Sequence, residues 1–142
     1  IKMMHLELPP EFVQVAFSEQ VPGEDESAQK FAIMGEYGNN VVIYDTESFL
    51  IQHQVMVNHV VKSFRFANNN RDLVVVTKDC KVRFYSLMKY EGIFLREVSN
   101  CHRGIITGMS ISDTSGYMLT GGEDNMIKIW DYEAQKTAPY YF

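Results

Sequence analysis

The stretch CHRGIITGMSISDTSGYMLTGGEDNMIKIWDY, residues 101–132, decides the fold of this chain. Residues 106–112 alternate between apolar and small or polar types, which predicts a half-buried β-strand. The Asp-Thr-Ser-Gly sequence at 113–116 is typical of a tight turn, and a second strand follows it. Another turn at Asp124-Asn125 leads into a third strand at 126–130. The stretch therefore predicts short antiparallel strands joined by tight turns.

The same pattern occurs three times along the chain. The units end in similar segments, which are VVIYD at 41–45, KVRFYS at 81–86 and IKIWDY at 127–132. A triplet of apolar residues at positions i, i+3 and i+5 precedes each segment. In the second and third units the triplet ends 19 residues before the closing aromatic residue, at Phe66 before Tyr85 and at Ile111 before Trp130. Two landmarks at one fixed spacing indicate an internal repeat.

The first unit departs from this spacing. Phe17 and Tyr44 are 27 residues apart, eight more than the corresponding residues of the other units. The extra residues fall in SEQVPGEDESAQ (18–29), whose proline, glycine and acidic run predict a surface loop. Since no stretch of helix length shows a 3.6-residue period, the sequence predicts an all-β protein.

Composition sets bounds on the function. The 142 residues include 13 Lys and Arg against 18 Asp and Glu, and this net charge of −5 disfavours a dedicated nucleic-acid binder. No apolar run reaches the roughly 18 residues that a membrane span needs. Cys80 and Cys101 form neither a zinc-binding nor a disulfide pattern, so we expect free thiols in a reducing, cytoplasmic compartment. Neither nucleic acid nor a membrane is expected as a partner.

Residues 101–132 resemble a WD40 repeat. His102, the apolar triplet, Gly121-Gly122, Asp124 and Trp130-Asp131 stand at the spacing of that family. The resemblance is strong in this unit and weaker in the two preceding ones. It implies four-stranded blades of a β-propeller.

The resemblance divides the chain into three blades of one propeller. These are a degenerate first blade at 1–58 with the acidic loop insertion 18–29, a basic second blade at 59–100 and the best-matching third blade at 101–142. Because propellers have roughly four to eight blades, three blades imply part of a larger propeller, seven-bladed or one of a tandem set. The remaining blades are expected from the same polypeptide, since the sequence begins with Ile1 instead of Met and stops at Phe142 in an apolar stretch.

The WD40 family often carries a buried hydrogen-bonded tetrad of His, Ser or Thr, Asp and Trp, whose members satisfy one another away from water. In the third unit His102, Asp124 and Trp130 fall on three of these positions. Gly122 occupies the Ser/Thr position, and Thr120 lies two residues earlier on the same strand face. The resemblance therefore implies a partial tetrad.

In the second unit Thr77, Asp79 and Tyr85 match the tetrad positions, with tyrosine in place of tryptophan. His59 stands two residues closer to its apolar triplet than His102 does, which leaves the part of His59 open. The first unit has no equivalent set.

Catalytic and metal-binding patterns are absent from the sequence. The four histidines make no HExxH motif and no pair at metal-ligand spacing, and no GxSxG motif supports a nucleophilic serine. The glycines near 35–38 and 121–122 precede no helix that could cradle a phosphate. We expect a non-enzyme with no cofactor and no bound metal.

Charge is unevenly distributed along the chain. Residues 62–103 carry nine basic and four acidic residues, whereas residues 1–61 carry two basic and nine acidic ones. Within this basic stripe, Lys78, Lys81 and Arg83 cluster on a turn and its outgoing strand. They are candidates for contact with an acidic partner such as tubulin. The alternative interpretation is a solvated strand face that binds nothing.

The resemblance implies a scaffold that binds other proteins and seldom catalyses. The degenerate repeats, the insertion and the aromatic connecting strands also look like the tandem propellers of large ciliary and centriolar proteins, which bind the microtubule wall. The sequence thus predicts a microtubule-associated scaffold of the cytoskeleton, with tubulin or other axonemal proteins as partners. The alternative is a WD40 recognition module, such as a ubiquitin-ligase substrate receptor or a signalling-complex adaptor.

Overall fold

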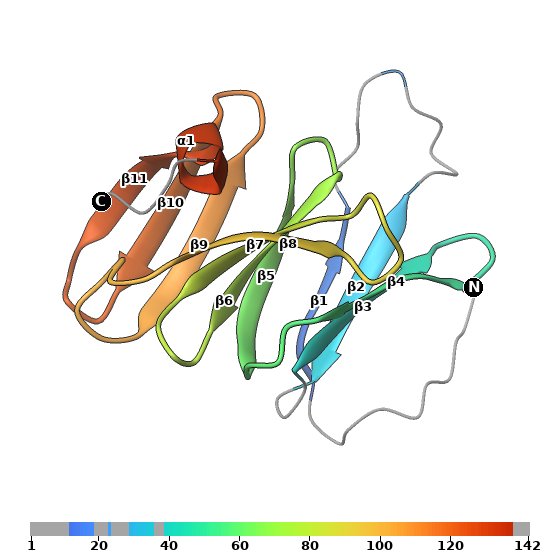
Figure 1. Cartoon of the computed structure of the whole chain (residues 1–142), viewed down its shortest axis with the longest axis horizontal. Coiled ribbons are helices and arrows are strands. Elements are labelled where there is room, and N and C mark those ends of the chain that lie inside the picture. Colours follow the sequence, from blue (N-terminus) through green and yellow to red (C-terminus); the bar gives the residue numbers. More distant parts are fainter. Residues whose placement is uncertain (1–11, 19–22, 24–28, 36–38, 138–142) are drawn as a thin grey trace.

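The computed structural model describes residues 12–18, 23, 29–35 and 39–137. These residues form eleven β-strands and one short helix (Figure 1). In chain order the elements are β1 (Phe12–Phe17), β2 (Lys30–Gly35), β3 (Asn40–Asp45), β4 (Ile51–Met56), β5 (Val61–Ala67), β6 (Asp72–Thr77), β7 (Val82–Ser86), β8 (Ile93–Val98), β9 (Ile106–Ser112), β10 (Tyr117–Gly122), β11 (Ile127–Asp131) and α1 (Tyr132–Thr137).

The strands form three antiparallel sheets, each made of strands that follow one another in the sequence. The first sheet has the order β1-β2-β3-β4, the second β5-β6-β7-β8 and the third β9-β10-β11. Figure 1 shows the three sheets stacked face to face in chain order. The all-β prediction is therefore confirmed, and the three sheets are consistent with WD40 propeller blades.

Predicted and observed elements agree closely in the third unit, up to the end of its last strand. β9 spans the predicted strand at 106–112, and β11 begins one residue later than predicted. Most of the insertion at 18–29 lies outside the described residues. The helix α1 departs from the all-β expectation.

Two contacts account for this helix. The Asp131 Oδ1 accepts a hydrogen bond from the Ala134 amide at 2.9 Å, which caps the first turn. The ring of Tyr132 packs edge to face on Phe84, with 5.8 Å between the ring centroids. Six residues are too few to show a helical period in the sequence. No helix among the described residues has the length and hydropathy that crossing a membrane requires.

Strand β6 is buried along its whole length between the first and third sheets. Leu73 and Val75 belong to the core cluster shared with the first sheet, whereas Val74 and Val76 belong to the cluster shared with the third sheet. Successive side chains of a strand point to opposite faces, so one strand serves two cores. The unbroken β-branched run of the sequence at 74–77 follows from this double burial.

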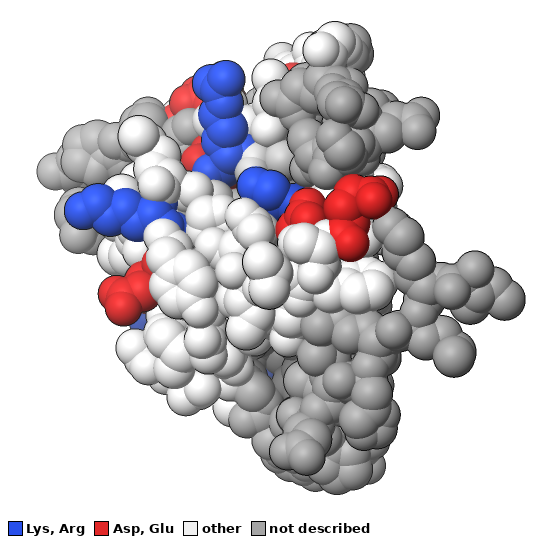
Figure 2. Space-filling model, turned by 90° about the vertical axis from the view of Figure 1, so that its right-hand side faces the viewer, with Lys and Arg blue, Asp and Glu red and all other residues white. Residues whose placement is uncertain are grey.

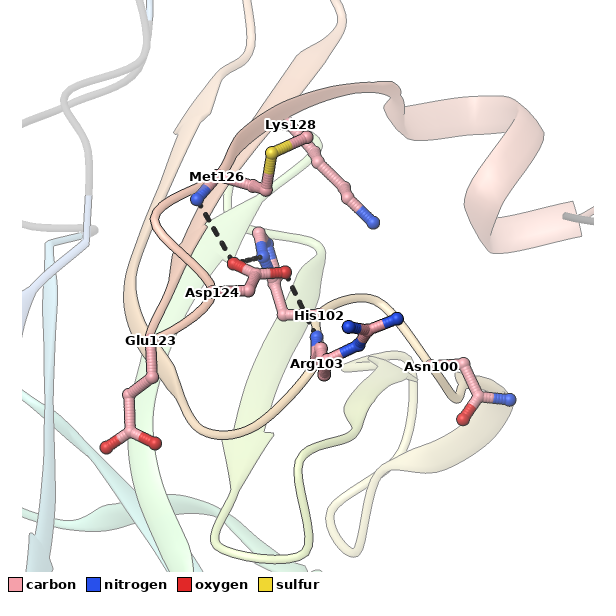
Figure 3. A pocket seen from close by; sticks show the side chains of 7 residues that line it. All are labelled: Asn100, His102, Arg103, Glu123, Asp124, Met126 and Lys128. Atoms are coloured by element: carbon pink, nitrogen blue, oxygen red, sulfur yellow. Dashed lines mark hydrogen bonds and ion pairs between the residues drawn. The ribbon is translucent and has the colours of Figure 1, made fainter.

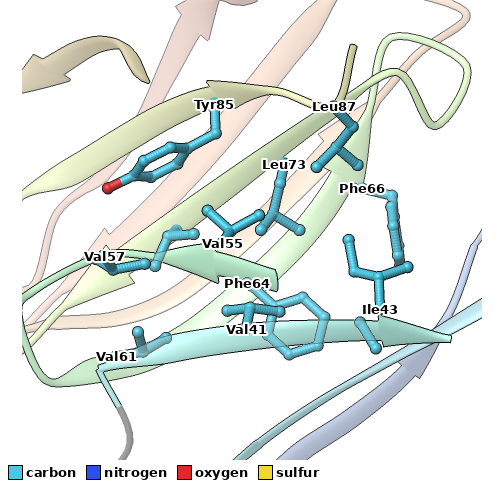
Figure 4. Packing of buried hydrophobic residues seen from close by; sticks show 12 residues of the cluster. Val41, Ile43, Val55, Val57, Val61, Phe64, Phe66, Leu73, Tyr85 and Leu87 are labelled. Carbon is cyan, nitrogen blue, oxygen red and sulfur yellow. The ribbon is translucent and has the colours of Figure 1, made fainter. Parts of the chain in front are cut away.

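The first core cluster fills the space between the first and second sheets (Figure 4). Val41, Ile43 and Val55 of the first sheet are fully buried there, as are Phe64 and Leu73 of the second sheet. Each such side chain contributes about 1.5–3 kcal/mol by its removal from water. Face-to-face apolar packing is therefore the main force that joins neighbouring sheets.

The outward faces of the first and third sheets are also apolar, but they are exposed. On the first sheet Val15 and Phe17 are 58% and 63% exposed. Figure 2 looks onto this end and shows a broad uncharged surface with Lys, Arg, Asp and Glu gathered along part of its border. On the third sheet Ile127 and Ile129 are 77% and 69% exposed. Both ends thus have the composition of a surface between two sheets.

A polar contact joins the β5–β6 turn to the β9–β10 turn. Asn68, Asn69 and Asn70 have positive φ angles of 52°, 52° and 63°, a conformation that asparagine tolerates better than most residues. The Asp113 carboxylate accepts hydrogen bonds from the amides of Asn68 at 2.9 Å and Asn69 at 3.1 Å. A carboxylate of the third sheet thereby fixes a left-handed turn of the second sheet.

Replacement of Asp113 by alanine is expected to lower the free energy of unfolding by about 1 kcal/mol, because two amides lose a charged acceptor. Chemical denaturation measures the change. Glu91→Ala, at an exposed position in the β7–β8 turn, is the matched control. Equal stability of the two variants contradicts a stabilising role for the contact.

Candidate functional site

The turn and loop residues that the sequence singled out, among them Asp79, His102 and Asp124, lie at one end of the sheets. Because the strands are antiparallel, this end collects the β6–β7 turn, the β8–β9 connection and the β10–β11 turn. The opposite end collects the turns that Asp113 and the three asparagines occupy. The functional site is therefore sought among the loops of the first of these ends.

A chain of hydrogen bonds joins the third sheet to the β8–β9 connection. The Trp130 Nε1–H donates to Thr120 Oγ1 at 2.8 Å. His102 Nε2 lies 2.7 Å from the same hydroxyl oxygen, and His102 Nδ1 lies 2.9 Å from Asp124 Oδ1. A neutral imidazole protonated at Nδ1 satisfies every group, since Thr120 then donates to Nε2 and Nδ1 donates to the carboxylate.

Thr120 completes this network, which corrects the expectation of a partial tetrad. The side chain of Thr120 is 1% exposed and contacts both His102 and Trp130. Gly122 explains why the hydroxyl comes from position 120 and not from position 122. A Cβ atom at position 122 would stand 2.5 Å from His102 Cγ. The imidazole fills the space that a serine or threonine at position 122 needs. The hydroxyl therefore comes from the strand position two residues earlier.

Asp124 ties the β10–β11 turn to the β8–β9 connection. Its Oδ2 accepts a hydrogen bond from the Arg103 amide at 3.0 Å. Its Oδ1 accepts a hydrogen bond from the Met126 amide at 3.1 Å and lies 2.9 Å from His102 Nδ1. Desolvation acts to raise the pKa of Asp124, but these hydrogen bonds outweigh it and lower the pKa to about 2. The carboxylate is thus ionised, and both of its oxygens are bound to groups of the two loops.

The second sheet carries a different network, centred on an arginine. The Arg83 guanidinium forms two hydrogen bonds to the Asp79 carboxylate, at 2.8 and 3.1 Å. Its Nε lies 3.2 Å from Glu97 Oε2, and Lys81 Nζ lies 3.2 Å from Glu97 Oε1. The Thr77 hydroxyl bonds both Asp79 and Arg83. The hydrogen bond from Arg83 is the main cause that lowers the pKa of Asp79.

The structure brings Thr77 and Asp79 together, as the sequence comparison of the units implied, but it places Tyr85 elsewhere. The Tyr85 ring lies in the first core cluster and packs edge to face on Phe94, with 5.7 Å between the ring centroids. Arg83 takes the place beside Asp79 because a buried guanidinium requires carboxylate partners. His59 Nδ1 approaches the same carboxylate at 3.6 Å.

The three candidate partner-binding residues differ in their exposure and in their contacts. Lys78 is exposed on the β6–β7 turn, whereas Lys81 pairs with Glu97. The Arg83 side chain is only 3% exposed and is held by two carboxylates. The charge of Arg83 is thus compensated inside the sheet, and its contact with a partner stays a prediction.

An open pocket lies beside the His102 network (Figure 3). Its lining residues are Asn100, His102, Arg103, Glu123, Asp124, Met126 and Lys128. Both ring nitrogens of His102 are hydrogen-bonded to protein groups, and the hydroxyl that Nε2 contacts belongs to Thr120, which is only 1% exposed. Among the described residues, no group of three or more His, Cys, Asp or Glu is placed to hold a metal ion. The pocket offers charge and hydrogen bonds for binding.

The fold and the network define a class of protein, an all-β chain made of propeller-type blades. Comparison with protein families adds that residues 94–131 match the WD40 family, described as "WD domain, G-beta repeat". The resemblance found in the sequence is thus confirmed, and the chain contains a WD40 repeat. Members of this family are generally non-catalytic scaffolds that bind other proteins.

Two curated relatives illustrate the similarity. Cilia- and flagella-associated protein 52 of Mus musculus is 24% identical over 91 residues, which are 64% of this chain and 14% of that protein. WD repeat-containing protein 3 of Homo sapiens is 26% identical over 110 residues, which are 78% of this chain and 11% of that protein. The chain therefore spans only a small part of the length of these relatives.

Thr120→Val is expected to lower the free energy of unfolding by about 1–3 kcal/mol, because Trp130 and His102 each lose their buried partner while the side-chain volume is kept. Thr120→Ser retains the hydroxyl and is the matched variant. Chemical denaturation compares the two. If valine is tolerated as well as serine, the hydroxyl does not hold the network together.

Gly122→Ser restores the residue type usual in the family, yet it is expected to destabilise this chain. The new Cβ meets the His102 ring and displaces it from Thr120 and Asp124. We expect a loss of about 1–3 kcal/mol in thermal or chemical unfolding. Gly121→Ala is the control, since the nearest atom to a Cβ there is Thr107 Oγ1 at 3.9 Å. Stabilisation by Gly122→Ser contradicts the proposed steric reason.

Proposed function

We propose that this chain is a non-catalytic scaffold, three consecutive blades of a larger WD40 propeller in a ciliary or centriolar protein that binds microtubules. The observation that carries the proposal is the pair of exposed apolar faces at the two ends of the stack. The blades correspond to 1–58, 59–100 and 101–142. The remaining blades belong to the same polypeptide.

The equivalence of positions between units supports a continuing ring. Val82 and Phe84 stand three residues and one residue before Tyr85, and both are fully buried against the third sheet. Ile127 and Ile129 stand at the same distances before Trp130 and are exposed. The third sheet therefore presents the kind of side chain that the second sheet buries under its neighbour. Another sheet of the same type fits this face.

The ciliary assignment rests on two supports. One is the name of similar proteins of Mus musculus and Homo sapiens, Cilia- and flagella-associated protein 52. The other is a pair of exposed cations, Lys78 and Arg103, on loops at one end of the sheets, which suit contact with an acidic surface such as that of tubulin. We propose tubulin or another axonemal protein as the partner, and a cytoplasmic, cytoskeletal location.

Co-sedimentation of the full-length protein with stabilised microtubules across a salt series tests this function. We expect salt-sensitive pelleting, which Lys78→Glu weakens about two- to fivefold while flattening its salt dependence. Lys89→Glu, an exposed cation at the opposite end of the second sheet, is the control. Absence from the pellet at every salt concentration overturns the microtubule assignment and favours a recognition module that binds soluble proteins.

A further inference from the structure

A second pocket, of about 370 Å³, lies between the first and second sheets, at the end opposite the His102 network. Lys30 and Asp45 of the first sheet form one wall, and Leu87 and Met88, which follow β7, form the facing wall. Both sheets that enclose this pocket have four strands. Its volume lies within the range of sites that hold a small ligand.

Backbone hydrogen bonds fix the walls of this pocket. The Ser18 amide donates to the Lys30 carbonyl at 2.8 Å, and the Ser18 hydroxyl accepts a hydrogen bond from the Lys30 amide at 3.0 Å. On the facing wall the Leu87 amide donates to the Arg71 carbonyl at 2.7 Å. The pocket is therefore preformed, which lowers the entropy cost of binding.

The equivalent place between the second and third sheets is filled by a tyrosine. Leu87 and Tyr132 each stand two residues after the closing aromatic residue of their unit. Lys30 and Asp72 each begin the second strand of their sheet. The Tyr132 hydroxyl donates to Asp72 Oδ2 at 3.0 Å, and both residues are only 3% exposed. Leucine in the position of this tyrosine leaves the corresponding space open between the first two sheets.

The open pocket offers a hydrogen-bond donor and an acceptor side by side. Lys30 and Asp45 stand directly opposite each other in the β2–β3 ladder, so their side chains lie on the same face. Two residues further along these strands, Ala32 and Ile43 belong to the first core cluster, so this face points toward the second sheet. The Asp45 Oδ2 accepts hydrogen bonds from the Ser48 amide at 2.8 Å and the Ser48 hydroxyl at 2.7 Å. An ammonium and an anchored carboxylate thus meet at the wall where the other pocket has a carboxylate alone.

We propose that this pocket binds a tyrosine side chain of a partner protein, in the way that Tyr132 fills the equivalent place. The ring lies against Leu87 and Met88, which is 84% exposed at the rim. The phenol oxygen accepts a hydrogen bond from Lys30, and the phenol proton is donated to Asp45. A hydroxyl is both donor and acceptor and so satisfies both groups, whereas Asp45 disfavours a phosphate or a carboxylate. This site goes beyond the proposed function, because it needs neither a microtubule nor the cations of the opposite end.

Saturation-transfer NMR with the full-length protein tests the site. The probes are the peptides acetyl-Gly-Tyr-Gly-amide and acetyl-Gly-Phe-Gly-amide, which differ by one hydroxyl. We expect the Tyr peptide to bind at least about fivefold more tightly, as one hydrogen bond to a charged group implies. Lys30→Met reduces this preference to less than about twofold. Lys62→Met, at the other end of β5 from the pocket, leaves the preference unchanged.

Leu87→Tyr combined with Lys30→Asp reproduces the pair of Tyr132 and Asp72 and is expected to abolish binding of the Tyr peptide, with no loss in melting temperature. Lys30→Met alone guards against misfolding of this double variant, because Ser18 bonds only the backbone of Lys30. Equal binding of the Tyr and Phe peptides, or full binding of the Tyr peptide by the filled variant, overturns the site.

Binding of neither peptide, as when another segment of the same polypeptide fills the pocket, also overturns the site. The two proposals fail separately. Microtubule pelleting without a preference for the Tyr peptide defeats this inference alone, whereas that preference without pelleting defeats only the proposed function.

Discussion

The burial of β6 on both faces is the constraint on which the rest of the structure depends. One strand contributes to two core clusters, so the second sheet cannot shift relative to either neighbour without exposing apolar side chains. The polar contacts at the two ends of the sheets are consequences of this packing. They act between turns that the apolar stack has already brought together.

The two loop networks show two ways to hold a blade turn. In the third unit a histidine, a threonine and a tryptophan share hydrogen bonds along one chain, and Asp124 closes it. In the second unit a buried arginine gathers Asp79 and Glu97 instead. Each arrangement pairs every buried polar group with another, as removal from water demands. The repeat therefore keeps the position of the aspartate while its partners change.

Most of the fold followed from the sequence, because strand patterns and turn residues are local signals. The repeat spacing predicted the strands of the third unit, and the apolar run at 73–77 predicted the buried strand β6. The network was harder, because the choice of Thr120 depends on the volume of the His102 ring next to Gly122. The ion pairs of Arg83 could not be predicted for a similar reason. A basic residue in a strand reveals its charge but not the carboxylates that reach it from another strand.

The two exposed ends of the stack differ, and this difference has a consequence for symmetry. One end presents Val15 and Phe17, and the other presents Ile127 and Ile129. A contact that joins unlike faces is heterologous, so every added sheet leaves the same two faces free until the last one meets the first. Closure into a ring is what ends such growth. Without closure, the same contacts produce an open-ended fibre of stacked copies.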